Sequence, residues 1–77
     1  MLSTYQEIRD RIYELARRHS LRPDWVDSTR SSRLLLLYDR QQIVVARAIV
    51  PVRYMSPLAI AELKYQLEGL FGKDWME

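Results

Sequence analysis

The sequence predicts a single small α+β domain over residues 1–77, built in the order helix, short helix, β-hairpin and helix. Two long segments carry apolar residues at the three- and four-residue spacing of an amphipathic helix. Between them lie two β-branched, apolar runs that are separated by a polar turn. A chain of 77 residues leaves room for one hydrophobic core only. Together these observations favour two helices packed on a hairpin of two to three antiparallel strands.

The first helix begins after a pair of N-cap residues. Ser3 and Thr4 are followed three residues later by Gln6 and Glu7, which is capping-box spacing. The apolar stripe that follows consists of Tyr5, Ile8, Ile12, Leu15, Ala16 and His19. We therefore predict a helix over about residues 4–19.

A short helix is predicted next, because Pro23 suits the first helical position and Asp24, Trp25 and Val26 follow it. The stretch up to residue 32 is expected to be irregular. The hairpin consists of Leu34–Tyr38 and Ile43–Val50. Its polar turn contains no Gly or Asn, so its turn type stays open.

The end of the hairpin and the second helix have clear signals. Pro51 should end the second strand or force a bulge, with Val52–Tyr54 expected as a short edge continuation. Ser56 and Pro57 form an N-cap with proline at the first helical position, and Gly72 is a plausible helix stop. The predicted apolar stripe of this helix consists of Ile60, Leu63, Leu67, Leu70 and Phe71.

Both faces of the hairpin are apolar, whereas a strand with one face in water should alternate. Two helices can cover one face, and little chain remains for the other. We therefore expect a second copy of the chain, or another protein, to cover it. Cover by a second copy would make the protein a homo-oligomer, which is the expected state. The alternative is a three-layer monomer with one helix on each face. The residues predicted for the buried interface are Leu35, Leu37, Val44, Ala46, Ala48 and Val50.

No pattern in the sequence indicates catalysis, a cofactor or a metal. The chain has no cysteine, and its single histidine, His19, falls in the last turn of the first helix, where a capping role is expected. Glu7 and Arg11 have helical ion-pair spacing, which is typical of a solvated face. No apolar run approaches the length of a membrane span, and the N-terminus lacks an export pattern. We expect a cytoplasmic, non-enzymatic protein without membrane contact.

The positive charge is concentrated in the middle of the chain. Residues 17–53 carry eight arginines against three acids, whereas residues 56–77 carry two lysines against four acids. Arginine suits acidic protein surfaces as well as phosphate. The residues predicted to make electrostatic contact with a partner are Arg22, Arg30, Arg33, Arg40, Arg47 and Arg53.

A second interpretation comes from the end of the first helix. The spacing of Ala16, Ser20, Leu21, Pro23 and Val26 resembles that of a helix-turn-helix, in which case the hairpin would be the wing of a winged helix. The resemblance spans about twenty residues and implies a DNA-binding transcriptional regulator. The residues then expected on DNA are Arg22, Thr29, Arg30 and Arg33. The would-be recognition segment also contains Asp24 and Asp27, which repel phosphate.

The function favoured by the sequence is protein binding. We expect a small regulator, inhibitor or adaptor that associates through one face of the hairpin and meets an acidic partner with its Arg-rich middle. DNA binding by a helix-turn-helix is the alternative. The two differ in their salt dependence, since DNA binding falls steeply with salt and an apolar interface does not.

Overall fold

A computed structural model describes the backbone of residues 2–77 and every side chain among them except those of Asp27 and Ser28. The predicted α+β class is confirmed: a helix is followed by a three-stranded antiparallel sheet and a second helix. The elements are α1 (Tyr5–Arg18), β1 (Arg22–Ser28), β2 (Ser32–Tyr38), β3 (Val44–Pro51) and α2 (Pro57–Phe71).

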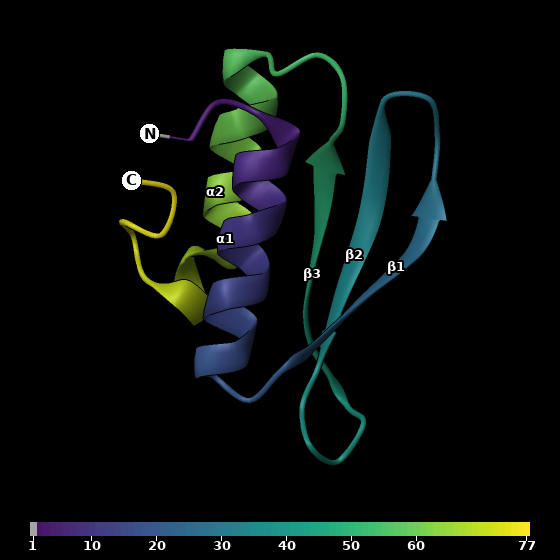
Figure 1. The fold of residues 1–77 in the computed structure, drawn as a ribbon, viewed down its shortest axis with the longest axis vertical. Helices are drawn as coiled ribbons and strands as arrows, with labels where there is room; N and C mark the ends of the chain where they lie inside the picture. Colours follow the sequence, from purple (N-terminus) through teal and green to yellow (C-terminus); the bar gives the residue numbers. More distant parts are fainter. Residues whose placement is uncertain (1) are drawn as a thin grey trace.

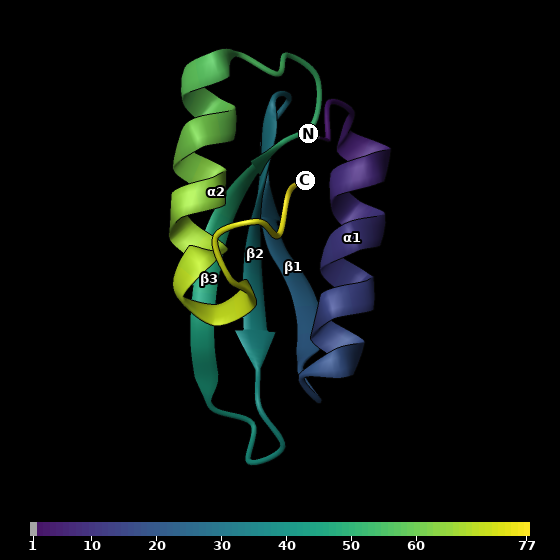
Figure 2. The ribbon, with the colours of Figure 1, turned by 90° about the vertical axis from the view of Figure 1, so that its left-hand side faces the viewer.

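The two helices lie side by side on one face of the sheet, and the strands follow the order β1-β2-β3 (Figures 1 and 2). In Figure 1 both helices lie to the left of the strands, and no described segment lies on the right. The domain therefore has two layers. The three-layer alternative, with one helix on each face, is wrong.

The short helix predicted around Pro23 is also wrong, because this segment forms β1. Six of its seven residues pair with β2, with Pro23 opposite Leu37 and Trp25 opposite Leu35, and the register shifts at Val26. Trp25 lies edge-on to Tyr5 and Tyr13, at ring distances of 6.2 and 6.5 Å. Its indole Nε1 also donates a hydrogen bond of 2.8 Å to the Tyr13 hydroxyl. Strand pairing and the burial of Trp25 beneath α1 outweigh the local helix signals, and Pro23 is tolerated because β1 is an edge strand.

The hydrophobic core lies between the sheet and the helices. The centres of the predicted helical stripes are confirmed, since α1 and α2 both bury their central apolar residues, but His19 at the end of the first stripe is exposed. The buried side chains are Ile8, Ile12, Leu15, Ala16, Leu35, Leu37, Ala48, Val50, Leu63, Leu67, Trp75 and Met76.

The C-terminal segment that follows α2 bridges the two helices (Figure 2). Trp75 and Met76 are buried, and the Trp75 indole Nε1 donates a hydrogen bond of 3.0 Å to the Lys64 carbonyl oxygen on α2. Arg11 on α1 donates to the Trp75 carbonyl oxygen at 2.7 Å, and the Leu2 amide donates to that of Met76 at 2.8 Å. The segment thus closes the core over the sheet and is part of the fold.

The hairpin turn and the end of β3 differ in detail from the prediction. Asp39 organises the turn, since its Oδ1 accepts hydrogen bonds from the amides of Gln41 and Ile43, and Gln42 has a φ of 66°. Gln42 thus takes the left-handed conformation that Gly or Asn usually supplies. The expected edge continuation over Val52–Tyr54 is wrong, because β3 ends at Pro51.

The C-terminus of α1 is closed by a Schellman arrangement with serine at the left-handed position. The Leu21 amide donates to the Ala16 carbonyl, the Ser20 amide donates to that of Arg17, and Ser20 has a φ of 58°. Glycine adopts this conformation without the steric penalty of a Cβ.

Replacing Ser20 with glycine is therefore expected to raise the free energy of unfolding by about 1 kcal/mol. Chemical denaturation of the wild type and of Ser20→Gly measures this difference. Ser3→Gly, outside any left-handed position, is the control and should bring no gain. A decrease on Ser20→Gly would show that the exposed hydrogen bond from Arg40 to the Ser20 hydroxyl outweighs the backbone effect.

The predicted capping box at the start of α1 is confirmed. The Thr4 hydroxyl accepts the Glu7 amide at 3.1 Å, and Glu7 Oε1 accepts the amides of Ser3 and Thr4 at 3.0 and 3.1 Å. The backbone N–H of Ser3 and that of Thr4 hold the pKa of the Glu7 carboxyl below its ordinary value of 4.5.

Because the folded-state pKa of Glu7 is lowered, its contribution to stability is complete above its ordinary pKa and is lost as the pH falls through the lower folded value. Thermal unfolding between pH 7 and pH 2 should therefore show a steeper loss of stability below about pH 4.5 for the wild type than for Glu7→Gln. Glu62→Gln removes an exposed carboxylate outside the cap and should follow the wild type. Identical pH profiles for all three proteins would contradict this role of Glu7.

Candidate protein-binding face of the sheet

The face of the sheet opposite the helices is the candidate functional site, and we call it the open face. Leu35 and Leu37 point into the core, so their neighbours on β2 point to the other side. The pairing of the strands extends this face across β1 and β3. The open face consists of Arg22, Asp24, Leu34, Leu36, Tyr38, Val44, Arg47 and Ile49.

The centre of the open face is apolar. Leu34 and Leu36 lie half-buried on the middle strand, whereas Val44 and Ile49 on β3 are 43% and 49% exposed. Exposed apolar side chains that are scattered singly are ordinary, but a contiguous apolar patch with a charged rim is typical of an interaction site. The open face has this second arrangement.

Most residues predicted for the interface serve the chain's own core instead. Leu35, Leu37, Ala48 and Val50 are between 0 and 2% exposed, and Ala46 packs against them. The helices cover this face, so these five side chains are not available to a partner. Of the six predicted residues only Val44 lies on the open face. The described chain leaves one face of the hairpin uncovered, and it is the side opposite to the predicted one.

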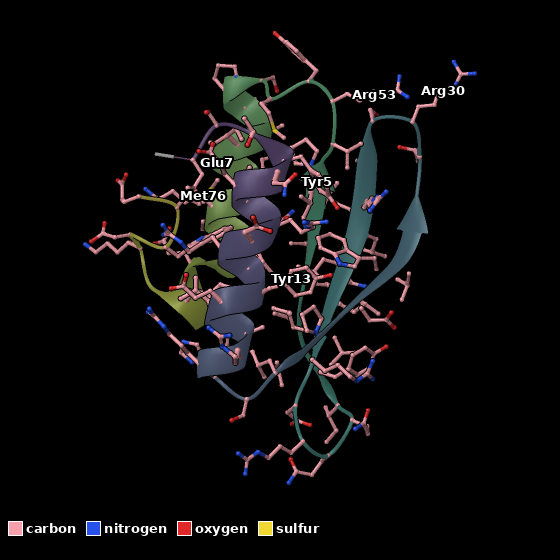
Figure 3. The ribbon with its side chains drawn as sticks, in the orientation of Figure 1. Tyr5, Glu7, Tyr13, Arg30, Arg53 and Met76 are labelled. Atoms are coloured by element: carbon pink, nitrogen blue, oxygen red, sulfur yellow. The ribbon has the colours of Figure 1, made fainter. Side chains whose placement is uncertain are left out.

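The six arginines predicted for electrostatic contact do not form one surface. Arg22 and Arg47 lie on the open face. Arg33 lies on the helix side, where it donates to the Tyr5 hydroxyl at 3.0 Å. Arg30 and Arg53 project together from the β1–β2 end of the sheet (Figure 3), whereas Arg40 lies in the opposite turn and donates to Ser20.

The two arginines of the open face differ in their contacts with the rest of the chain. The Arg22 guanidinium lies 4.5 Å from the centre of the Tyr38 ring and donates a hydrogen bond of 2.9 Å to the Gln42 side chain. Arg22 is therefore held in place by a cation–π contact and a polar contact. Arg47, by contrast, makes no ion pair or side-chain hydrogen bond within residues 2–77, and neither does Asp24. Both are free to meet a partner's charge.

The outer edge of β3 carries one polar contact from α2. The backbone amide of Ile49 donates a hydrogen bond of 2.9 Å to the Oε1 atom of Gln66. This amide points away from β2 and would otherwise face solvent at the edge of the sheet.

Several of the titratable residues have structural roles. Glu14 pairs with Arg18 at 2.7 Å, and Asp39 holds the turn. His19 is the C-cap residue of α1, as the sequence indicated, and its ring lies 5.6 Å from that of Phe71. Among the side chains that the structure describes, no group of three or more His, Asp or Glu could hold a metal ion.

The helix-turn-helix interpretation loses its second helix, because Arg22–Ser28 is a strand. The left-handed Ser20 belongs to the C-terminal cap of α1 and leads directly into β1. The hairpin is a core element of the sheet and does not project as a wing (Figure 1).

Sequence reasoning missed Asp24, Leu34, Leu36 and Ile49 as residues of the uncovered face. A signal for them was present in Arg47. A charged residue in the middle of an apolar strand marks the side that is not packed on the core, and Ile49 shares that side with it. The placement of Leu34 and Leu36 on the same face follows from the antiparallel pairing of their strand with that of Arg47 and Ile49. Asp24 could not be assigned to this face from the sequence, because its segment was not predicted to be a strand.

Comparison of the chain with protein-family models, curated proteins and solved structures finds no match. Neither helix in the described part of the chain is long and apolar enough to cross a membrane.

Proposed function

We propose that this protein is a non-enzymatic protein-binding module of the cytoplasm, a small regulator, inhibitor or adaptor, whose contact surface is the open face of the sheet. The observation that carries this proposal is the placement of both helices on the same side of the sheet. That placement leaves the apolar residues Leu34, Leu36 and Ile49 without cover from the described chain.

The composition of the open face supports binding to a protein surface. Complete burial of one exposed aliphatic side chain contributes about 1.5–3 kcal/mol, and these residues are about half exposed or less. Several such side chains together supply enough free energy for association. The charged residues Arg22, Asp24 and Arg47 lie on the edge strands, which matches the polar rim around the apolar centre of protein interfaces.

DNA binding, the alternative from the sequence, would have to use a different surface. The observation in its favour is the pair Arg30 and Arg53 at the β1–β2 end of the sheet (Figure 3). Two arginines without a recognition helix offer few phosphate contacts. A gel-shift titration on random duplex at low and at moderate salt tests this alternative. We expect no binding at moderate salt. At low salt we expect the same weak binding for the wild type and for Arg30→Ser/Arg53→Ser. Tight binding that the double variant abolishes would favour DNA.

Photo-crosslinking tests the proposed function without knowledge of the partner. A photoreactive phenylalanine analogue is placed at Leu36, on the open face, and in a control at Tyr65, which is 79% exposed on α2. After irradiation of the cells that produce the protein, adducts to protein are expected from position 36 and not from position 65. Adducts only to nucleic acid, or equal labelling from both positions, would contradict the proposal.

A further inference from the structure

One row of the open face carries opposite charges at its two ends. Asp24 on β1 lies opposite Leu36, and Leu36 lies opposite Arg47 on β3. The two charged residues are thus separated by the middle strand, with backbones about 10 Å apart at the usual strand spacing. Neither of them has an ion-pair partner among the described side chains.

This row is complementary to itself in one of two orientations. If a second copy is turned by 180° about an axis parallel to β2, its β3 lies over β1, and Asp24 faces Arg47 of the second copy. If the axis runs across the strands, β1 lies over β1, so that Asp24 meets Asp24 and Arg47 meets Arg47. Opposite charges stabilise the first arrangement, and like charges oppose the second.

We propose that the open face binds a second copy of this chain, with the two-fold axis parallel to β2. This inference rests on the proposed function and names its partner. Leu36 of each copy then lies at the centre of the contact, between two pairs of Asp24 and Arg47. Both ion pairs lie on edge strands, at the rim, where a charge keeps part of its hydration.

The middle strand and the row of Tyr38 also fit this arrangement. Leu34 packs on Leu34 of the second copy and Tyr38 on Tyr38, because both lie on the middle strand. Arg22 comes over Val44 of the second copy. Its guanidinium is already held over Tyr38, so its aliphatic part can cover the valine. Two sheets about 10 Å apart can then form an aligned sandwich.

The size of the face sets the expected strength of the dimer. Three strands of seven to eight residues present a surface of about 14 by 23 Å, which is roughly 320 Å² for each copy. Twice this footprint is about 640 Å², which lies below the roughly 1,200–2,000 Å² of stable specific interfaces and within the range of weak, transient contacts. We therefore expect a weak, reversible dimer that forms only at high protein concentration.

Charge reversal tests the orientation. In sedimentation experiments over a concentration series at low salt, Asp24→Arg and Arg47→Asp should each weaken the dimer by at least about tenfold, because each variant creates two like-charge contacts. The double variant Asp24→Arg/Arg47→Asp restores both pairs with their signs exchanged. Its dissociation constant should return to within about threefold of the wild type. Arg30→Asp, which reverses a charge away from the open face, should leave the dimer unchanged.

The outcomes separate this inference from the proposed function. A double variant as weak as either single variant would overturn the orientation, and a wild type that stays monomeric at high concentration would overturn the second copy as the partner. In both cases crosslinks from position 36 to another protein would leave the proposed function intact. Circular dichroism checks the fold of each variant. If Asp24→Arg does not fold, Asp24→Asn and Arg47→Gln serve instead, each with an expected weakening of about threefold.

Discussion

Replacing Trp75 with alanine is expected to lower the free energy of unfolding by about 3–5 kcal/mol, the largest effect of any substitution considered. The side chain is 3% exposed, packs edge-on against Phe71 at a ring distance of 5.8 Å and donates a hydrogen bond to the Lys64 carbonyl. The substitution removes these contacts and leaves a cavity between the two helices. A chain of this length has a total stability of only about 4–12 kcal/mol, so much of it should be lost.

Urea denaturation followed by circular dichroism measures this loss. Tyr65→Ala is the matched control, because it removes an aromatic side chain that is 79% exposed on α2, and its effect should stay within about 0.5 kcal/mol. If Trp75→Ala unfolds at the same urea concentration as Tyr65→Ala, the C-terminal segment does not contribute to the core in solution.

Replacing Leu36 with glutamate is expected to weaken self-association by at least about a hundredfold while leaving the fold intact. Leu36 lies at the centre of the open face, where the substitution in both copies would bury two carboxylates against each other. In the monomer the same carboxylate faces solvent, between Asp24 and Arg47. The effect should therefore show in the dissociation constant and hardly in the melting temperature.

Sedimentation velocity over a concentration series measures the association. Leu58→Glu is the matched control, because Leu58 is 70% exposed on α2 and lies away from the open face. It should associate as the wild type does. An unchanged dissociation constant for Leu36→Glu would refute the open face as the contact surface, whereas equal losses in both variants would point to the helices.

The helices could be predicted from the sequence because their signals are local. A capping box at Thr4 and Glu7, and a cap followed by proline at Ser56 and Pro57, fix where each helix begins. Three- and four-residue spacing then identifies the buried stripes. These features depend on neighbours within a few residues along the chain, and the structure confirms them.

The strand β1 could not be predicted in the same way, because its stability comes from distant parts of the chain. Pro23 and Asp24 are poor strand formers, and the segment is held by pairing with β2 and by the contacts of Trp25 with Tyr5 and Tyr13. None of these partners is visible in the local pattern. The expectation of a short helix followed local signals that the tertiary contacts override.

The site was predictable as a type of surface but not residue by residue. Because every residue from Leu34 to Leu37 is apolar, the middle strand alone does not say which side the helices cover. Arg47 on the neighbouring strand does, since a charge at that position is easily accommodated only outside the core. The small residues Ala46 and Ala48 lie on the side of β3 that the helices cover, where α2 packs close to the strand.

The contact between Gln66 and the Ile49 amide bears on how far association can proceed. Face-to-face pairing leaves the edges of both sheets open, and β3 is rich in Val and Ile, a composition that favours the addition of further strands and the growth of fibres. A side chain that already occupies the outward amide of Ile49 opposes the docking of another strand there. Gln66 would in this way favour a closed pair of chains over an open-ended polymer. The protein could then have an apolar open face without aggregating through the edge of its sheet.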